Sequence, residues 1–166
     1  MSVPLELKER MLVAPRLTLA AAESLTCGRV QARIGEASGA SAYFLGGITA
    51  YSLDQKVRHL GVERRAAKPV DAVSMAVARE MALGVCTLFG SDVGVATTGY
   101  AEPAPARGVA DPFAWWAIAH RGGRGKTLGL RTGRVECPGA TRLQVQAIVA
   151  DALLAELVAY LREIGR

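Results

Sequence analysis

The sequence predicts an α/β protein, a three-layer α/β/α sandwich formed by a single domain over residues 1–166. Three observations support this fold class. Strand-like and helix-like segments alternate over the first hundred residues, which is typical of a sheet covered by helices. Hydrophobic residues make up 51% of the chain but aromatic residues only 5%, so small and aliphatic side chains must build the core. A length of 166 residues is enough for one such core and short for two.

The elements expected in the first half of the chain follow its apolar pattern. Residues 4–13 predict a short amphipathic helix, and residues 17–23 predict a buried strand. Residues 25–39 place apolar side chains at helical spacing and end in a Ser-Gly pair, which indicates a second helix. Residues 43–51 have the β-branched and aromatic content of a strand, and residues 53–62 predict a short helix.

The second half of the chain is divided by a loop. Residues 100–112 are rich in Pro and Ala and cannot continue a regular element. The elements expected around this loop are a helix from its N-cap Ser74 to Gly90, a strand over 92–99, antiparallel strands over 113–120 and 127–136, and a helix over 141–163. The sheet should therefore be mostly parallel, with an antiparallel pair added late in the chain.

The charge of the chain narrows the choice of partners. The formal net charge of +5 comes mostly from arginine, with sixteen Arg against four Lys. An excess of this size suits an anionic ligand or a nucleic acid. The one concentrated run of cations lies between Arg121 and Arg134, without interleaved aromatics or a known nucleic-acid motif. This favours a solvated hairpin, and nucleic-acid binding is kept as a third alternative.

Cysteine, histidine and hydropathy patterns exclude several classes of protein. Cys27, Cys86 and Cys137 are odd in number and contain no CxxC pair, which is typical of a reducing cytoplasm. His59 and His120 form no spaced pair with each other or with the cysteines, so neither a metal nor another cofactor is expected. No apolar run approaches the roughly 18 residues of a membrane helix, and the amino terminus lacks a signal-peptide pattern. We expect a cytoplasmic protein with no membrane contact.

The stretch "LAAAESLTCGRV" (19–30) holds the first candidate for chemistry. Ser24 lies where a strand ends and a helix is expected to begin, the position at which parallel-sheet enzymes place reactive groups. Free N–H groups of that helix would stabilise an oxyanion beside the serine. Since no histidine is near, the natural base is a lysine whose pKa of about 10.4 is lowered by burial. "YSLDQK" offers Tyr51 and Lys56 for this role. Spacing alone favours a simpler interpretation, an N-cap serine and an exposed lysine.

Four ordered motifs between about residues 6 and 160 match one known family. "AESLTCG" (22–28) resembles the signature A-E-S-C-T-G-G, and residues 47–56 are similar to a segment G-x-x-x-Y-S-N-E-A-K. Residues 72–84 are similar to a helix A-V-S-E-E-V-A-R-E-M-A-x-G, and residues 98–103 to part of a loop T-G-I-A-G-P-G-G. On these motifs the chain resembles the CinA carboxy-terminal domain family, which includes the nicotinamide-nucleotide amidohydrolases.

This resemblance implies a cytoplasmic, metal-independent hydrolase that converts the carboxamide of nicotinamide mononucleotide to the acid and ammonia. It implies Ser24 as the nucleophile, Lys56 as its base and Tyr51 in support. The substrate-binding residues that it implies are Glu23, Thr26 and Gly28 around the helix start, Thr98 and Gly99 at the pocket floor, and Arg142 for a substrate phosphate. A homo-oligomer is also expected, since small α/β enzymes are often oligomeric.

The chain departs from the family pattern around the expected substrate pocket. Leu25 and Cys27 replace a cysteine and a glycine of the signature. The G-P-G-G stretch becomes Glu102 to Pro105, where a carboxylate and a second proline replace N–H donors. Thr141 replaces an aspartate before the last helix. Two alternatives therefore stay open: a divergent enzyme for another small amide, and a protein that has lost turnover and only binds a ligand.

Overall fold

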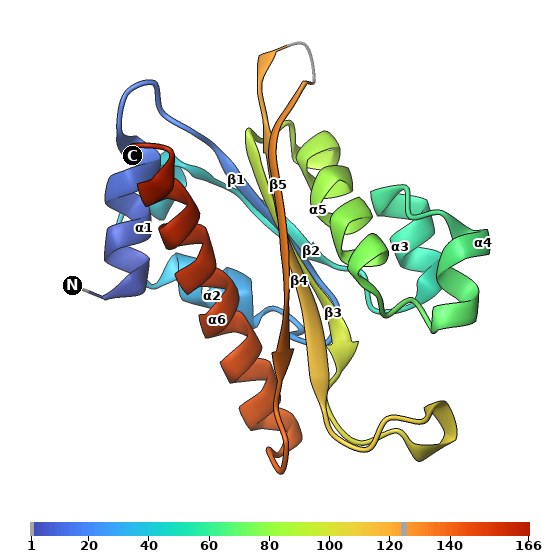
Figure 1. Ribbon diagram of the computed structural model, residues 1–166. Helices are drawn as coiled ribbons and strands as arrows, with labels where there is room; N and C mark the ends of the chain where they lie inside the picture. Colours follow the sequence, from blue (N-terminus) through green and yellow to red (C-terminus); the bar gives the residue numbers. More distant parts are fainter. Residues whose placement is uncertain (1, 124–125) are drawn as a thin grey trace.

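The computed structural model describes residues 2–123 and 126–166 and arranges them in three layers (Figure 1). Its helices are α1 (Val3–Leu12), α2 (Arg29–Gly35), α3 (Leu53–Leu60), α4 (Arg64–Ala67), α5 (Met75–Phe89) and α6 (Arg142–Glu163). Its strands are β1 (Leu19–Glu23), β2 (Phe44–Thr49), β3 (Val93–Tyr100), β4 (Phe113–Arg121) and β5 (Thr127–Glu136). The α/β fold class is confirmed, and the short helix α4 is an addition to the predicted elements.

One sheet with the strand order β2-β1-β3-β4-β5 forms the middle layer. β1 pairs in parallel with β2 and β3, whereas β4 pairs antiparallel with β3 and β5. The sheet is therefore mixed. Its parallel part comes from the alternating first hundred residues, and the late hairpin β4–β5 supplies the antiparallel part. Parallel pairing thus covers less of the sheet than the sequence predicted.

Helices cover both faces of the sheet, with α1, α2 and α6 on one face and α3, α4 and α5 on the other (Figure 1). On the first face, buried side chains such as Leu7, Ile34 and Leu157 form one apolar cluster with residues of the strands. On the second face, the cluster consists largely of Ala and Val, with Met81 and Val85 of α5 among them. Two clusters on opposite faces are what a three-layer sandwich requires.

The helix α5 also fixes the position of α3. A Cβ at Gly84 would clash with the carbonyl oxygen of Leu60, so only glycine lets the end of α3 rest on α5. Ser74 is the N-cap of α5, as predicted, and its side chain accepts a hydrogen bond from the N–H of Val77 (3.1 Å). Because α3 carries Lys56, this packing sets the depth at which the lysine lies.

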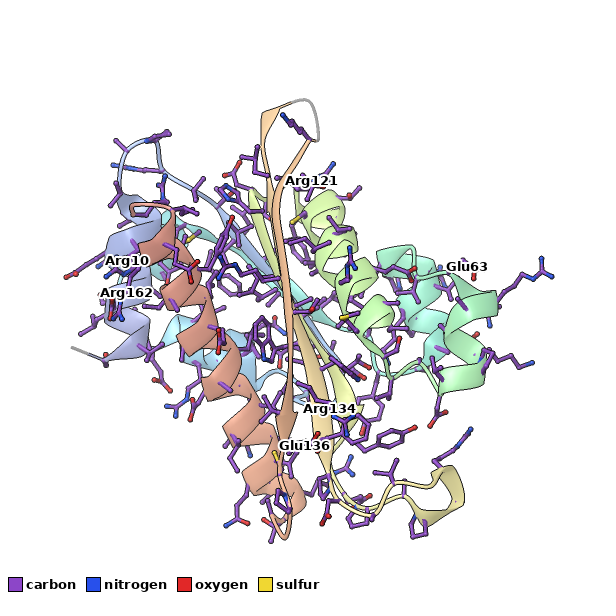
Figure 2. All side chains as sticks on the ribbon, in the orientation of Figure 1. Arg10, Glu63, Arg121, Arg134, Glu136 and Arg162 are labelled. Carbon is purple, nitrogen blue, oxygen red and sulfur yellow. The ribbon has the colours of Figure 1, made fainter. Side chains whose placement is uncertain are left out.

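An ion cluster joins α1 to the end of α6. Arg10 and Arg162 lie side by side there (Figure 2), and both donate to the carboxylate of Glu6. The donor–acceptor distances are 2.7 Å from Arg10 and 2.6 and 2.7 Å from Arg162. Hydrogen bonds from Arg162, and then from Arg10, lower the pKa of Glu6 below its usual value. The cluster therefore favours the docked position of α1 most strongly when Glu6 is ionised.

The helix α6 is long and apolar enough to cross a membrane when it is judged by length and composition alone. No such segment was expected from the sequence. In the fold, half of its most apolar window is buried, and Val149, Leu153 and Leu157 are fully buried. These are the properties of a core helix that presents one face to a sheet.

The predicted run of cations lies on the β4–β5 hairpin and is largely engaged within the fold. Arg131 pairs with Glu163 of α6, and Arg134 pairs with its neighbour Glu136 and lies over an aromatic ring of β4 (Figure 2). Arg124 lies outside the described residues. Carboxylates and a ring thus take up much of the charge, which favours the solvated-hairpin interpretation of this run.

Candidate active site

The carboxyl ends of β1, β2 and β3 meet at one edge of the sheet, because the three strands run in parallel. Ser24 follows β1 directly, Tyr51 lies two residues after β2, and Gly99 and Tyr100 end β3. Ligands of α/β proteins bind at this kind of edge, outside the carboxyl ends of the strands. The fold therefore gathers three of the predicted site residues in one region.

Glu23, the last residue of β1, is fully buried and binds the start of α2 through its carboxylate. Oε2 accepts hydrogen bonds from the N–H groups of Gly28 (2.9 Å) and Val30 (3.1 Å) and from the hydroxyl of Thr26 (2.6 Å). Oε1 accepts from the backbone N–H (2.9 Å) and the side-chain amide (3.1 Å) of Gln31. The first turn of a helix leaves such N–H groups unpaired. Glu23 therefore occupies the helix terminus that was predicted to stabilise an oxyanion.

Residues 24–28 form a turn, although the sequence predicted a helix from residue 25. Cys27 (φ +51°) and Gly28 (φ +96°) have a left-handed backbone, and Gly28 is the N-cap of α2. Ser24 is therefore not the helix cap. Ser24 is 6% exposed, and its hydroxyl makes no hydrogen bond to any part of the chain that the structure describes. The serine is thus left with an unengaged hydroxyl at the strand end.

Lys56 lies one turn into α3. Ser52 caps this helix, since its hydroxyl accepts a hydrogen bond from the N–H of Gln55 (3.4 Å). Only 3% of Lys56 is exposed, contrary to the interpretation of an exposed lysine. Burial lowers the pKa of Lys56 from 10.5 to about 8, and the carboxylate of Asp71 opposes part of this change. About a tenth of such an amine is unprotonated at pH 7, enough for a general base.

Ser24 and Lys56 line one cavity of about 460 Å³. Tyr51 and Gly99 also border it, so four of the predicted site residues share this space. No hydrogen bond joins Ser24 Oγ to Lys56 Nζ within the described chain. In enzymes without substrate such contacts are often long and tighten only in the complex. The cavity therefore has the components of a serine–lysine site in an open arrangement.

Five predicted substrate-binding residues do not border the cavity. Glu23, Thr26 and Gly28 build the turn around Ser24 from within. Thr98 is fully buried, and its hydroxyl donates to the carbonyl oxygen of Ala72 (2.7 Å). Because Ala72 lines the cavity, Thr98 supports the wall from behind. The fifth residue is the arginine at the start of α6.

That arginine, Arg142, was predicted to bind a substrate phosphate but is already engaged. Its Nη1 pairs with Glu102 (2.9 Å), and its Nη2 donates to the hydroxyl of Tyr51 (2.6 Å). Glu102 therefore neutralises the guanidinium. The hydroxyl of Tyr51, which was expected to assist Lys56, is bound to Arg142 instead.

Besides Ser52, the cap of α3, four polar residues of the cavity were not predicted from the sequence: Lys68, Asp71, Tyr100 and Arg107. Arg107 pairs with Asp71 (3.1 Å), and the hydroxyl of Tyr100 donates to the same carboxylate (3.1 Å). They come from the turn before α5, the end of β3 and the loop 100–112. These segments have no periodic pattern that would place them together. The only sequence signal is Arg107, a cation within a loop otherwise rich in Pro and Ala.

The fold and this cavity define a three-layer α/β/α protein with a buried serine and a buried lysine at the carboxyl edge of its parallel strands. Among residues 2–123 and 126–166, no three His, Cys, Asp or Glu side chains gather as metal ligands. The family model described as the CinA C-terminal domain matches residues 5–161. The chain belongs to this family, and the resemblance seen in its motifs is confirmed.

Relatives and solved structures agree with this assignment. A CinA-like protein of Chlorobium limicola is 40% identical over 156 residues, which cover 93% of this chain and 36% of the relative. A putative competence-damage inducible protein of Moorella thermoacetica is 46% identical over 93 residues, or 56% of this chain and 22% of the relative. The chain thus spans at most about a third of these curated relatives. The crystal structure of a CinA superfamily protein from Klebsiella pneumoniae superposes with a TM-score of 0.85 at 27% identity, covering 97% of this chain and 96% of that chain.

Proposed function

We propose that the protein is a metal-independent amidohydrolase in which Ser24 attacks a small carboxamide, with nicotinamide mononucleotide as the expected substrate. One observation carries this proposal: the buried Ser24 and Lys56 border the same cavity, and neither side-chain head is bound to another described residue. An unengaged hydroxyl and an amine of lowered pKa are the two parts of an activated nucleophile.

The reaction follows from these two groups. Lys56 Nζ, in its neutral form, takes the proton of the Ser24 hydroxyl while Oγ bonds to the carboxamide carbon and the C=O electron pair moves to oxygen. When the pair returns, the C–N bond breaks, and the leaving nitrogen takes the proton from the Lys56 ammonium and departs as ammonia. Water then attacks the ester with Lys56 again as base. The Oγ–C bond breaks, the proton returns to Ser24, and the acid is released.

The backbone N–H of Leu25 is the donor that we assign to the oxyanion. Leu25 follows the nucleophile and lines the cavity, and its backbone N–H has no acceptor within the described chain. The N–H groups of Gly28, Val30 and Gln31 are already bound to Glu23. Backbone donors fixed beside the reacting carbon stabilise the charge that develops on oxygen.

A second candidate function is a divergent member that acts on another small amide or binds a ligand without turnover. The ion pair between Glu102 and Arg142 favours it, because the arginine expected for a substrate phosphate is neutralised. Calorimetric titration of nicotinamide mononucleotide separates the alternatives. Binding without ammonia release supports a silent binding protein.

We also propose that the protein is a cytoplasmic homo-oligomer. Its three free thiols, one of them exposed, suit a reducing compartment. Leu143 and Ile148 expose large apolar side chains on α6 and offer a surface for a second copy. Light scattering of the purified protein tests the assembly.

The test of the proposed reaction is ammonia release in the presence of a chelator, over pyridine nucleotides and small amides. Wild-type protein is expected to release ammonia and the matching acid, and Lys56→Ala is expected to lose the activity. Lys8→Ala, on α1 and outside the cavity lining, is the control for loss of a lysine and should keep the activity. If concentrated wild-type protein releases no ammonia from any amide, the proposal of catalysis is wrong.

A further inference from the structure

We propose that Asp71 is a positioning residue whose carboxylate stabilises the ammonium form of Lys56 across the cavity when the lysine takes a proton. This inference rests on the proposed function, in which Lys56 takes and returns that proton. Asp71 is the only carboxylate among the residues that line the cavity in the described chain. No direct ion pair joins Asp71 to Lys56, so the carboxylate acts through the electrostatic field of the cavity.

The backbone holds Asp71 in an unusual conformation at the cavity wall. Asp71 (φ +54°) and Ala72 (φ +56°) are consecutive residues in the left-handed region, where non-glycine residues are rare. Such conformations lower the stability of the fold and persist only where the surroundings impose them. Here the hydroxyl of Thr98 holds the carbonyl of Ala72 (2.7 Å), and the N–H of Ala72 donates to the carbonyl of Ala67 (2.9 Å). The turn therefore holds Asp71 at the cavity wall although its backbone conformation lowers the stability of the fold.

The side chain of Asp71 is fixed at both oxygens. Oδ2 accepts the hydrogen bond from the hydroxyl of Tyr100 (3.1 Å), and Oδ1 pairs with the guanidinium of Arg107 (3.1 Å). Both partners also line the cavity. A carboxylate held by these two partners keeps one orientation at the cavity wall.

Among the described residues that line the cavity, Lys56 has no other source of compensating negative charge. Lys68 and Arg107, which also line the cavity, are cations that oppose a further positive charge. The acidic groups on the flanking helices have partners of their own: Asp54 pairs with Arg64, and Glu80 accepts a hydrogen bond from the N–H of Glu63. The ring of His59 is hydrogen-bonded to Gln55. The remaining charged groups, Arg58 and Arg79, are cations. Of the residues in the described ranges, Asp71 alone raises the pKa of Lys56 and so favours its protonated form.

This compensation matters at one moment of the proposed reaction. When the proton moves from Ser24 to Lys56, an ammonium forms in a place shielded from bulk water. A buried charge without a counter-charge is costly. Burial alone lowers the pKa of Lys56, and the Asp71 carboxylate raises it again. Asp71 thus keeps the amine basic enough to accept the proton while burial keeps part of it neutral.

The test is the pKa of Lys56 in Asp71→Asn, because asparagine keeps the shape and tolerates the left-handed backbone. Competitive acetylation with acetic anhydride across a pH series, read by peptide mass spectrometry, measures this pKa without any need for catalysis. The wild-type value is expected at about 8. In Asp71→Asn we expect a fall of about half a pH unit or more. Tyr100→Phe, which removes one hydrogen bond but keeps the charge, should leave the pKa unchanged.

A further variant tests the sign of the effect. Arg107→Gln removes the cation that neutralises Asp71, so the pKa of Lys56 should rise or stay, and it should not fall. The inference is overturned if Asp71→Asn leaves the pKa of Lys56 unchanged, or if Tyr100→Phe lowers it equally. A fall in Arg107→Gln also overturns it, and this variant leaves the turn at Asp71 intact.

The same variants separate this inference from the proposed function. In an active enzyme the rise of kcat/KM with pH should move to lower pH in Asp71→Asn by the amount that acetylation shows. If the pKa of Lys56 falls but no amide is hydrolysed, the electrostatic role of Asp71 stands and the proposed function fails. If ammonia is released but the pKa does not respond to Asp71→Asn, only this inference fails.

Discussion

Replacement of Glu23 by glutamine tests the turn that carries Ser24. The carboxylate accepts five hydrogen bonds, three at Oε2 and two at Oε1. A glutamine oxygen can keep the three donors from Thr26, Gly28 and Val30, but its NH₂ group then faces the two donors of Gln31. Two donors without an acceptor, together with the lost charge at the helix start, should lower the free energy of unfolding by about 2–4 kcal/mol.

For a domain of this size, that loss lowers Tm by roughly 5–15 °C. Circular dichroism during thermal unfolding, supported by urea unfolding, measures the change. Glu9→Gln is the matched control, because Glu9 is exposed on α1 and should change stability by less than about 0.5 kcal/mol. If Glu23→Gln melts within about 2 °C of the wild type, the carboxylate does not hold the helix start as described.

Other predictions concern buried charge and packing. Lys56→Met should stabilise the fold by up to about 3 kcal/mol at pH 7, because the lysine pKa falls from 10.5 to about 8 on folding. This gain should be complete below pH 8 and vanish as pH rises to 10.5, as urea unfolding at several pH values would show. Gly84→Ala should lower stability by about 1–3 kcal/mol through its clash with Leu60, whereas Gly35→Ala, which meets no atom within 4 Å, should not. The ionised carboxylate of Glu6, whose pKa is lowered on folding, stabilises the wild type, and this contribution to the free energy of unfolding is lost as pH falls through that pKa. Glu6→Gln should lack the contribution at every pH, so its unfolding should not show this sensitivity to acid.

The elements of the fold could be predicted from the sequence where the apolar period is clear. α5 illustrates this, since Ser74 at its start and Gly90 at its end give it unambiguous limits. The start of α2 was placed too early, because apolar spacing continues through the turn at 25–28. A carboxylate that caps from before the turn, as Glu23 does, leaves no signal in the spacing.

The candidate site was predicted in part. Ser24 lies at the end of β1, and Lys56 lies on α3, the helix that follows β2; the order of elements reveals both positions. Arg142 was assigned to a ligand because its long-range partner Glu102 lies forty residues away in a loop without pattern. Asp71 and Arg107 escaped prediction for the same reason, since their meeting depends on the path of the loop 100–112. Contacts of this kind follow from tertiary structure and not from local sequence.

The departure at Leu25 has a physical explanation in the core. Its side chain is 2% exposed and packs in an apolar cluster with Ala101, Ala114 and Val145. This cluster joins the turn after Ser24 to the start of the loop 100–112 and to α6. A large aliphatic residue at this position therefore fills space under the cavity and links the nucleophile to the altered loop.

The central claim is that Ser24 is the nucleophile of an amidohydrolase. Ser52 offers a matched control, because it lines the same cavity and is only the cap of α3. The decisive measurement compares ammonia release from nicotinamide mononucleotide by the wild type, Ser24→Ala and Ser52→Ala under identical conditions. The wild type and Ser52→Ala should release ammonia at similar rates while Ser24→Ala releases none above background. Release by Ser24→Ala at the wild-type rate would contradict the claim.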